Sequence, residues 1–220
     1  MKRFFLLCMT LSIAILGSQA QENSGFWSVK AGVNFANFTN SNYTSDCQTG
    51  FNVGALRAFS LSKQIPIYLQ SGLSFEMKGA QNSYSVDGFG YSTTIKSYAL
   101  EVPLLVNYGI KISDNSTIHP FAGVYYSVAL GGTMEEGGES INPYKKESAE
   151  FGNPPEVDNT RILSRSDFGI RFGLDYKYKK YSIGVAYDAG VMNIFAKDFR
   201  DANYDASTGS FSINLGYYFK

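Results

Sequence analysis

The chain has 220 residues, with 19 Lys and Arg balanced by 19 Asp and Glu, and charged residues make up only 17% of it. A balanced charge excludes a basic nucleic-acid binder, which needs a positive surface to meet the phosphates. The 16 Tyr, 17 Phe and 22 Gly argue against intrinsic disorder and favour short strands joined by tight turns. One His and two Cys leave little material for a zinc site or a disulfide framework.

The first twenty residues have the pattern of an export signal. Two basic residues precede an apolar run at residues 4–16, and small or polar residues follow up to Ala20. This order is typical of a secretory signal, so we expect cleavage after Ala20 and a barrel domain at residues 21–220. No later stretch has the roughly 20 apolar residues of a membrane helix, and a closed β-barrel is then the remaining way to span a membrane.

Alternation of apolar and polar residues runs through the rest of the chain and indicates strands whose two faces meet different surroundings. The segments, in chain order, are residues 27–35, 50–62, 67–78, 97–108, 118–131, 168–177, 181–188 and 209–220. Two are less regular: Arg57 interrupts the apolar face of the second, and both faces of the fifth carry apolar residues. At around ten residues each, these segments are long enough to cross a bilayer as tilted strands.

The connections between these segments alternate in length. Short polar turns are expected at 61–66, 110–117 and 177–180, and long loops at 39–49, 79–93, 132–166 and 196–208. Short turns at one end and long loops at the other are typical of outer-membrane barrels. We therefore predict an all-β fold, an eight-stranded antiparallel up-and-down transmembrane β-barrel with both termini on the short-turn side.

Alternation alone does not say which face is wet. A soluble lipocalin-like ligand binder also has eight strands, but its outer face would carry many Lys, Glu and Thr. Here the polar face is mostly Gly, Ser and Asn, which suits a narrow lumen that side chains fill. The apolar face carries Tyr, Phe or Trp near the strand ends, as an interfacial girdle does. These features favour a barrel in the outer membrane of a Gram-negative bacterium.

Seven charged residues fall on the predicted inner face. An unpaired buried charge is costly and eight strands leave no open channel, so we interpret the seven as a structural ion-pair network. A charged conduit or an acid–base site is the functional alternative. Pro103 lacks an N–H and favours a bulge that aims Glu101 inward. The seven residues are Lys30, Glu76, Lys78, Glu101, Arg171, Asp175 and Asp188.

The sequence predicts no catalytic residue, cofactor or metal site. His119 is the only candidate base for a Ser/His/acid set, and it follows the short turn at 110–117, which places it at the periplasmic rim. An enzyme acting on outer-leaflet lipid needs its base at the other end, and the chain has no G-x-S-x-G or phosphate-binding glycine motif. We expect His119 to meet the membrane interface and the protein not to be an enzyme.

Several short motifs are shared with a known family. They include Leu100-Glu101-Val102-Pro103-Leu104-Leu105, Pro120-Phe121-Ala122-Gly123-Val124-Tyr125-Tyr126, Asp167-Phe168-Gly169-Ile170-Arg171-Phe172-Gly173-Leu174 and Gly216-Tyr217-Tyr218-Phe219-Lys220. In these residues the chain resembles the PorT-like small outer-membrane barrels of Bacteroidetes. The resemblance extends over essentially the whole mature chain and implies an outer-membrane location. The namesake of the family belongs to the machinery of a gliding-associated secretion system.

Together these observations predict a structural or interactive role. A rigid barrel surrounded by outer-membrane lipid would display its long loops to protein partners, and residues 132–166 form the largest candidate contact surface. No nucleic-acid partner is expected. A component of a PorT-type secretion or gliding apparatus, a narrow channel and a soluble lipocalin-like binder stay open as alternatives.

Overall fold

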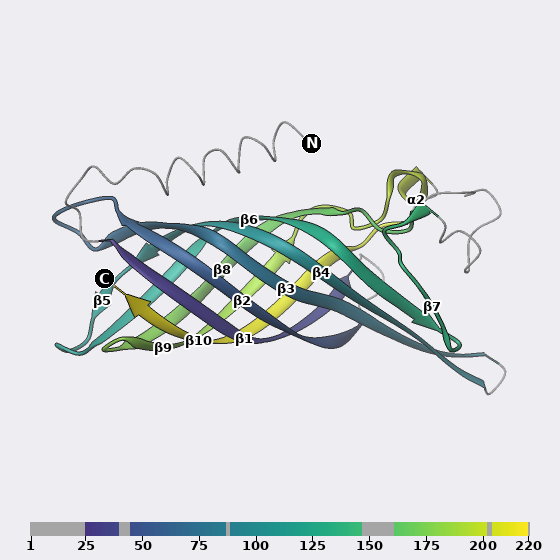
Figure 1. The fold of residues 1–220 in the computed structure, drawn as a ribbon, viewed down its shortest axis with the longest axis horizontal. Coiled ribbons are helices and arrows are strands. Elements are labelled where there is room, and N and C mark those ends of the chain that lie inside the picture. Colours follow the sequence, from purple (N-terminus) through teal and green to yellow (C-terminus); the bar gives the residue numbers. More distant parts are fainter. Residues whose placement is uncertain (1–24, 40–44, 87–88, 147–160, 202–203, 220) are drawn as a thin grey trace.

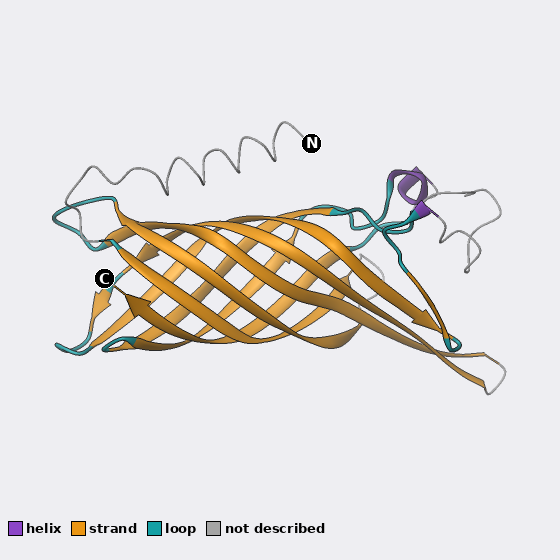
Figure 2. Ribbon diagram, in the orientation of Figure 1, coloured by secondary structure: helices purple, strands orange, loops and turns teal. Residues whose placement is uncertain are grey.

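The computed structural model describes residues 25–39, 45–86, 89–146, 161–201 and 204–219, so the predicted export signal lies outside the described residues. Nearly all of the described chain is strand, with one short helix, α2 (Lys197–Asp201) (Figure 2). The strands are β1 (Phe26–Thr39), β2 (Asp46–Ser60), β3 (Ile67–Val86), β4 (Phe89–Tyr108), β5 (Ile110–Lys111), β6 (Ser116–Glu136), β7 (Glu139–Ile141), β8 (Ser166–Tyr178), β9 (Tyr181–Gly190) and β10 (Ser207–Phe219).

Eight of these strands are long and close into a barrel (Figure 1). Each long strand pairs antiparallel with the next along the chain, β4 pairs directly with β6 and β6 with β8, and β10 returns to pair with β1. The two shortest strands, β5 and β7, are additions to β6. The predicted eight-stranded antiparallel up-and-down barrel is therefore confirmed.

The two ends of the barrel differ. At one end, here called the short-turn end, the turns at 61–66, 109–115 and 179–180 lie side by side, because Gly109 N–H donates to Pro66 O and Lys179 N–H to Asn115 O, both at 2.8 Å. Strand β1 begins and β10 ends there (Figure 1). The opposite end, here called the long-loop end, carries the connections after β1, β3, β6 and β9.

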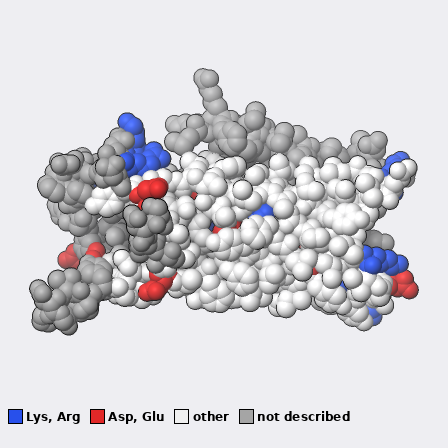
Figure 3. Space-filling model, turned by 180° about the vertical axis from the view of Figure 1, so that it is seen from behind, with Lys and Arg blue, Asp and Glu red and all other residues white. Residues whose placement is uncertain are grey.

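The outward face of the barrel is apolar. Leu215 is 66% exposed and Ile183 51% exposed, and alternate residues along β1, β8 and β10 are exposed in the same way. Figure 3 shows Lys, Arg, Asp and Glu gathered toward the two ends, with few of them on the wall between. Exposed apolar surface of this extent marks contact with lipid. A lipocalin-like barrel would have the opposite arrangement, and that alternative is not supported.

Among the described residues, no helix is both long enough and apolar enough to cross a membrane.

Two predicted loops are shorter than the sequence analysis indicated. Residues 79–86 and 89–93 continue β3 and β4, with pairing from Gly79 opposite Lys96 to Val86 opposite Phe89. Strand β6 runs on to Glu136 and turns into β7 through Gly137 and Gly138, whose φ angles of 58° and 90° suit glycine. The predicted loop boundaries were wrong because strands pair through backbone hydrogen bonds, which do not require an apolar face. Apolar and polar residues stop alternating where these strands leave the lipid, although the strands themselves continue.

Substitution of Leu215 tests which face meets lipid. Leu215 lies midway along the apolar face of β10, so we expect Leu215→Lys to lower the free energy of unfolding in lipid vesicles by about 2–4 kcal/mol. Leu61, 55% exposed in a short turn, is the matched control, and Leu61→Lys is expected to change it by less than about 0.5 kcal/mol. Equal small effects in urea titrations of both variants would contradict a lipid-facing wall.

Candidate functional site: an ion-pair cluster in a closed lumen

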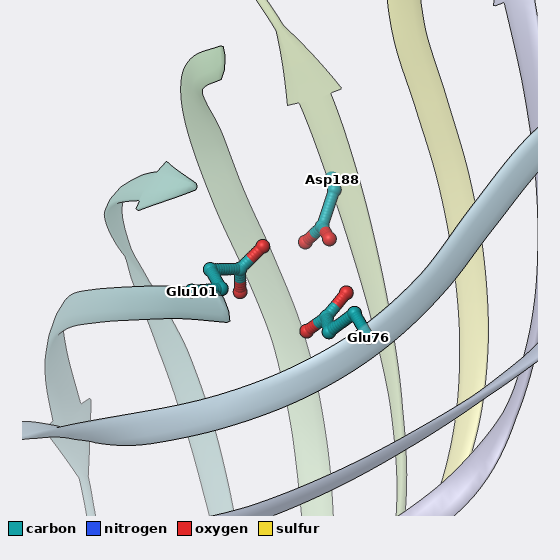
Figure 4. Close-up of side chains that lie close together, drawn as sticks. All are labelled: Glu76, Glu101 and Asp188. Carbon is teal, nitrogen blue, oxygen red and sulfur yellow. The ribbon is translucent and has the colours of Figure 1, made fainter. Parts of the chain in front are cut away.

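Five charged residues meet inside the barrel, about midway along it. Glu76 and Lys78 lie two positions apart on β3 and therefore share the inner face. Arg171 on β8 and Asp188 on β9 are directly opposed in the antiparallel register, and Glu101 reaches the same point from β4. Figure 4 shows the three carboxylates turned toward one another.

Each of the two cations contacts all three carboxylates. The Lys78 Nζ lies 2.9 Å from Glu101 Oε2, 2.9 Å from Asp188 Oδ2 and 3.1 Å from Glu76 Oε2. The Arg171 guanidinium lies 2.5 Å from Asp188 Oδ1, 2.7 Å from Glu101 Oε1 and 2.9 Å from Glu76 Oε1. The cluster therefore links β3 and β4 to β8 and β9 across the lumen.

This cluster is shielded from bulk water, and Glu101 is 0% exposed. Charges in such surroundings must be paired, because burial without a partner costs several kcal/mol per ion. Three carboxylates face two cations, so one negative charge is in excess when all are ionised. The aromatic ring of Tyr125 on β6 adds a neutral contact, with Lys78 Nζ 4.7 Å from its centroid.

The carboxylate oxygens of Glu76, Glu101 and Asp188 lie within 4.8 Å of one another, a spacing that would suit a metal ion. Lys78 and Arg171 already contact every one of these carboxylates, which is the neutralising role that a metal would have. The geometry therefore supports an ion-pair cluster and gives no ground for a metal centre.

The other two predicted lumen residues form a separate pair. Lys30 on β1 forms an ion pair with Asp175 on β8, which also accepts a hydrogen bond of 3.2 Å from Tyr218 Oη. The Lys30 Nζ lies 5.2 Å from the centroid of the Phe121 ring. The structure thus places all seven predicted residues on the inner side but divides them into a group of five and a group of two.

The bulge predicted at Pro103 is wrong. Strand β4 shifts its register against β6 between Tyr98 and Ala99, and it runs past Pro103 without a shift. Glu101 points inward through the ordinary alternation of the strand. The missing N–H of Pro103 is therefore tolerated without displacing the chain.

His119 does not meet the membrane interface, as the sequence analysis expected. It lies inside the lumen near the short-turn end, 4% exposed, with Nδ1 3.0 Å from Asn107 Oδ1. The rings of Phe26, Tyr68 and Tyr218 surround it, with centroids 6.0, 6.5 and 6.2 Å away. The pattern of β6 was ambiguous because both of its faces carry apolar residues, and the inner face proves to include Phe121 and Tyr125. His119, Phe26, Tyr68 and Tyr218 thus form a ring cluster at the short-turn end, here called the aromatic base.

The long-loop end carries an apolar cap that the sequence analysis missed. Arg165 holds it to β6, donating hydrogen bonds of 3.1 Å to Ala129 O and Leu130 O and one of 3.4 Å to Tyr144 O. Burial raises the pKa of Tyr144, whose hydroxyl lies 2.6 Å from Ser97 Oγ. The buried members of the cap are Ala129, Tyr144, Ile162, Leu163, Ile194, Phe199 and Ala206.

Two small cavities lie between these layers. One of about 50 Å³ separates the cap from Lys78, and one of about 40 Å³ lies between Arg171 and Lys30. Each has room for little more than a few water molecules. Among the described residues, the lumen is therefore interrupted at three levels by the cap, the ion-pair cluster and the aromatic base.

Comparison with known proteins supports this fold. The family model described as "Outer membrane protein beta-barrel domain" matches residues 18–196. A major outer membrane protein from Thermus thermophilus has a TM-score of 0.51 at 14% identity, covering 89% of this chain and all of the other. Neisserial surface protein A has a TM-score of 0.51 at 12% identity, covering 87% and 96%. The outer membrane enzyme PagL has a TM-score of 0.47 at 12% identity, covering 86% and 98%.

At 12% and 14% identity, the two structures with a TM-score of 0.51 show a shared fold alone. No curated protein sequence matches the chain. The matching family model describes outer-membrane barrels in general, so the PorT-like assignment stays a prediction.

Substitutions in the cluster test whether its charges depend on one another. Lys78→Met leaves three buried carboxylates with one cation, so we expect the free energy of unfolding in lipid vesicles to fall by about 3–5 kcal/mol. Glu101→Gln removes the excess negative charge and keeps a hydrogen-bonding group, so its cost should stay near 1 kcal/mol.

The double variant Lys78→Met with Glu101→Gln provides the control. Removing a carboxylate together with its cation should recover about 0.5–3 kcal/mol relative to the sum of the single changes. Additive costs in urea unfolding would mean that the five residues do not act as one cluster.

Proposed function

Because the chain belongs to the outer membrane protein beta-barrel domain family, we propose that it is an outer-membrane barrel that serves as a rigid support for contacts with partners outside the cell. One observation carries this proposal. Within the described residues, the cap, the ion-pair cluster and the aromatic base interrupt the lumen at three levels, whereas β3, β4 and β6 continue past the apolar outward face at the long-loop end. Outer-membrane barrels keep their short turns in the periplasm, so the long-loop end faces outward.

The part of the barrel beyond the lipid is an ordered sheet. It consists of β3 from residue 79, β4 up to residue 97, β6 from residue 132 and β7, and it projects past the rest of the barrel (Figure 1). Ile95, Met134 and Ile141 pack one side of this projecting sheet against the cap. A sheet braced in this way offers a partner a preformed surface, which lowers the entropy lost on binding.

Where the structure describes exposure on this sheet, at residues 79–83, 92–97, 132–136 and 139–141, the exposed side chains are polar. Ser83, Ser92, Glu135, Glu139 and Ser140 are all exposed. Hydroxyl and carboxylate groups on rigid strands suit hydrogen bonding to a protein partner, as in the polar rim of protein interfaces. The projecting sheet thus takes over the role that the sequence analysis assigned to the loop at 132–166, of which residues 147–160 lie outside the described residues.

The position of His119 also supports the proposal that the protein is not an enzyme. His119, the one histidine of the chain, is buried at the short-turn end and contacts Asn107 and aromatic rings. A histidine that serves as general base needs a reacting proton within hydrogen-bond reach. Its burial at the periplasmic end leaves it far from lipid in the outer leaflet.

A role in a PorT-type secretion apparatus would be a more specific form of this proposal. Its support is the set of strand motifs around Glu101, Tyr125 and Arg171. All three of these residues belong to or contact the ion-pair cluster. The resemblance to PorT-like barrels therefore indicates a similar barrel interior rather than a similar binding partner. Loss of secreted cargo after deletion of the gene would favour the apparatus.

Conductance measurement tests the closed lumen. We expect the refolded protein to give no discrete current steps in planar bilayers, because three layers of side chains interrupt the path. Arg171→Ala should be equally silent, since the cap and the aromatic base remain. Regular current steps from the wild-type protein would favour a narrow channel instead.

Shortening of the projecting sheet tests the contact surface. Gln81 and Thr94 are directly opposed, so replacing residues 82–93 with Asn-Gly closes a tight hairpin without disturbing the barrel. We expect a cell-impermeant, amine-reactive cross-linker to give adducts with wild-type protein on intact cells, and the shortened variant to lose them.

The control variant is Ser113→Ala in the turn at the opposite end. It should keep the adducts, and all proteins should keep the mobility shift on boiling that a closed barrel gives in SDS gels. Unchanged adducts in the shortened variant, or none with the wild-type protein, would overturn the assignment of this surface.

A further inference from the structure

Arg57 is out of place on the outer wall. It lies on β2 directly opposite Trp27 of β1, and opposed residues share a face of the sheet. Trp27, Val53 and Phe51 on this face are exposed to the lipid side. A guanidinium is always charged, and a charge on the lipid-facing side of a barrel is unfavourable unless it reaches a polar partner. In the sequence, Arg57 is the residue that interrupts the apolar face of the segment at residues 50–62.

Two aromatic rings hold the Arg57 side chain. Its guanidinium carbon lies 5.3 Å from the centroid of the Trp27 ring and 5.5 Å from that of Phe59. Stacking on aromatic faces is favourable for a planar guanidinium and limits the positions it can adopt. The donors of Arg57 are thus positioned without using any hydrogen bond.

Within the described part of the chain, no protein group neutralises Arg57. No carboxylate lies at ion-pair distance from it, in contrast to Arg171, and no carbonyl accepts its hydrogen bonds, in contrast to those of Arg165. The described residues therefore supply no acceptor for the five N–H donors on the lipid-facing side. The lipid around the barrel is the surrounding medium that can supply one.

The position of Arg57 indicates which acceptor lies within its reach. It lies three residues before β2 ends at Ser60, close to the short-turn end, where the apolar wall meets the headgroups of the periplasmic leaflet. The described turns of the short-turn end carry four exposed lysines against one acidic residue, Asp114. The lysines are Lys63, Lys111, Lys179 and Lys180. Such an excess of positive charge attracts anionic headgroups.

We propose that Arg57, held between Trp27 and Phe59, binds the phosphate of an anionic phospholipid in the periplasmic leaflet of the outer membrane. The planar fork of a guanidinium matches phosphate oxygens in a bidentate manner. The acyl chains of the lipid would lie along the apolar wall of β1 and β2. This site depends on the membrane placement of the barrel and is independent of contacts at the long-loop end.

Lipid retention in native mass spectrometry tests the site. The detergent-solubilised protein is mixed with equal amounts of phosphatidylglycerol and diacylglycerol of the same acyl chains, and the fraction carrying each lipid is measured. We expect the wild-type protein to retain phosphatidylglycerol. Arg57→Gln should reduce this retention about fivefold, the ratio expected for one basic residue near an anionic headgroup.

Two further variants separate a site from diffuse attraction. Lys111→Gln removes one positive charge at the same end, but Lys111 already pairs with Asp114 at 2.9 Å, so retention should be unchanged. Trp27→Leu keeps the charge and removes one supporting ring, so retention should fall between those of the wild-type protein and Arg57→Gln.

Three results would overturn the proposal. They are equal losses in Arg57→Gln and Lys111→Gln, unchanged retention in Arg57→Gln, and equal retention of diacylglycerol and phosphatidylglycerol by the wild-type protein. The mobility shift on boiling verifies folding of each variant. If Arg57→Gln does not fold, Arg57→Lys replaces it, with partial loss expected because lysine lacks the bidentate fork.

Discussion

Charge pairing across the lumen is the interaction on which the rest of this barrel depends. Lys78 and Arg171 each contact the same three carboxylates, and the five side chains come from β3, β4, β8 and β9. Backbone ladders connect each strand only to its neighbours, whereas this cluster connects opposite walls. An eight-stranded barrel is narrow enough for side chains to meet in its centre, and that width makes the cross-link possible.

The same narrowness argues against transport through the barrel. Charged side chains pair with one another in the centre, and the cavities described beside them are small. The apolar cap and the aromatic base close the two ends by a different means, hydrophobic and ring packing. Because the interior is used for stability, specific contacts are left to the outside, to lipid along the wall and to partners at the projecting sheet.

The inner and outer faces were predictable from the sequence because period two is fixed by strand geometry. That periodicity placed Lys30, Glu76 and Asp188 on one side before any contact was known, although it said nothing of which charges would pair. The cap escaped prediction because Tyr144 and Leu163, from the connection between β7 and β8, and Phe199, from that between β9 and β10, follow no common period. The location of His119 was predicted wrongly because both faces of β6 carry apolar residues. Its inner side contacts aromatic rings and its outer side meets lipid, so the sequence pattern did not show which face is inside.

Arg57 and Arg171 show one physical rule in two surroundings. A cation that leaves water needs an anion close by, and Arg171 finds three on neighbouring and opposite strands. Arg57 has only Trp27 and Phe59 beside it within the described protein, and rings can position a guanidinium but cannot neutralise it. The missing anion then belongs to the membrane, where phosphates form a continuous layer at this depth. A break in an otherwise regular apolar face therefore carries more functional information than the regular positions around it.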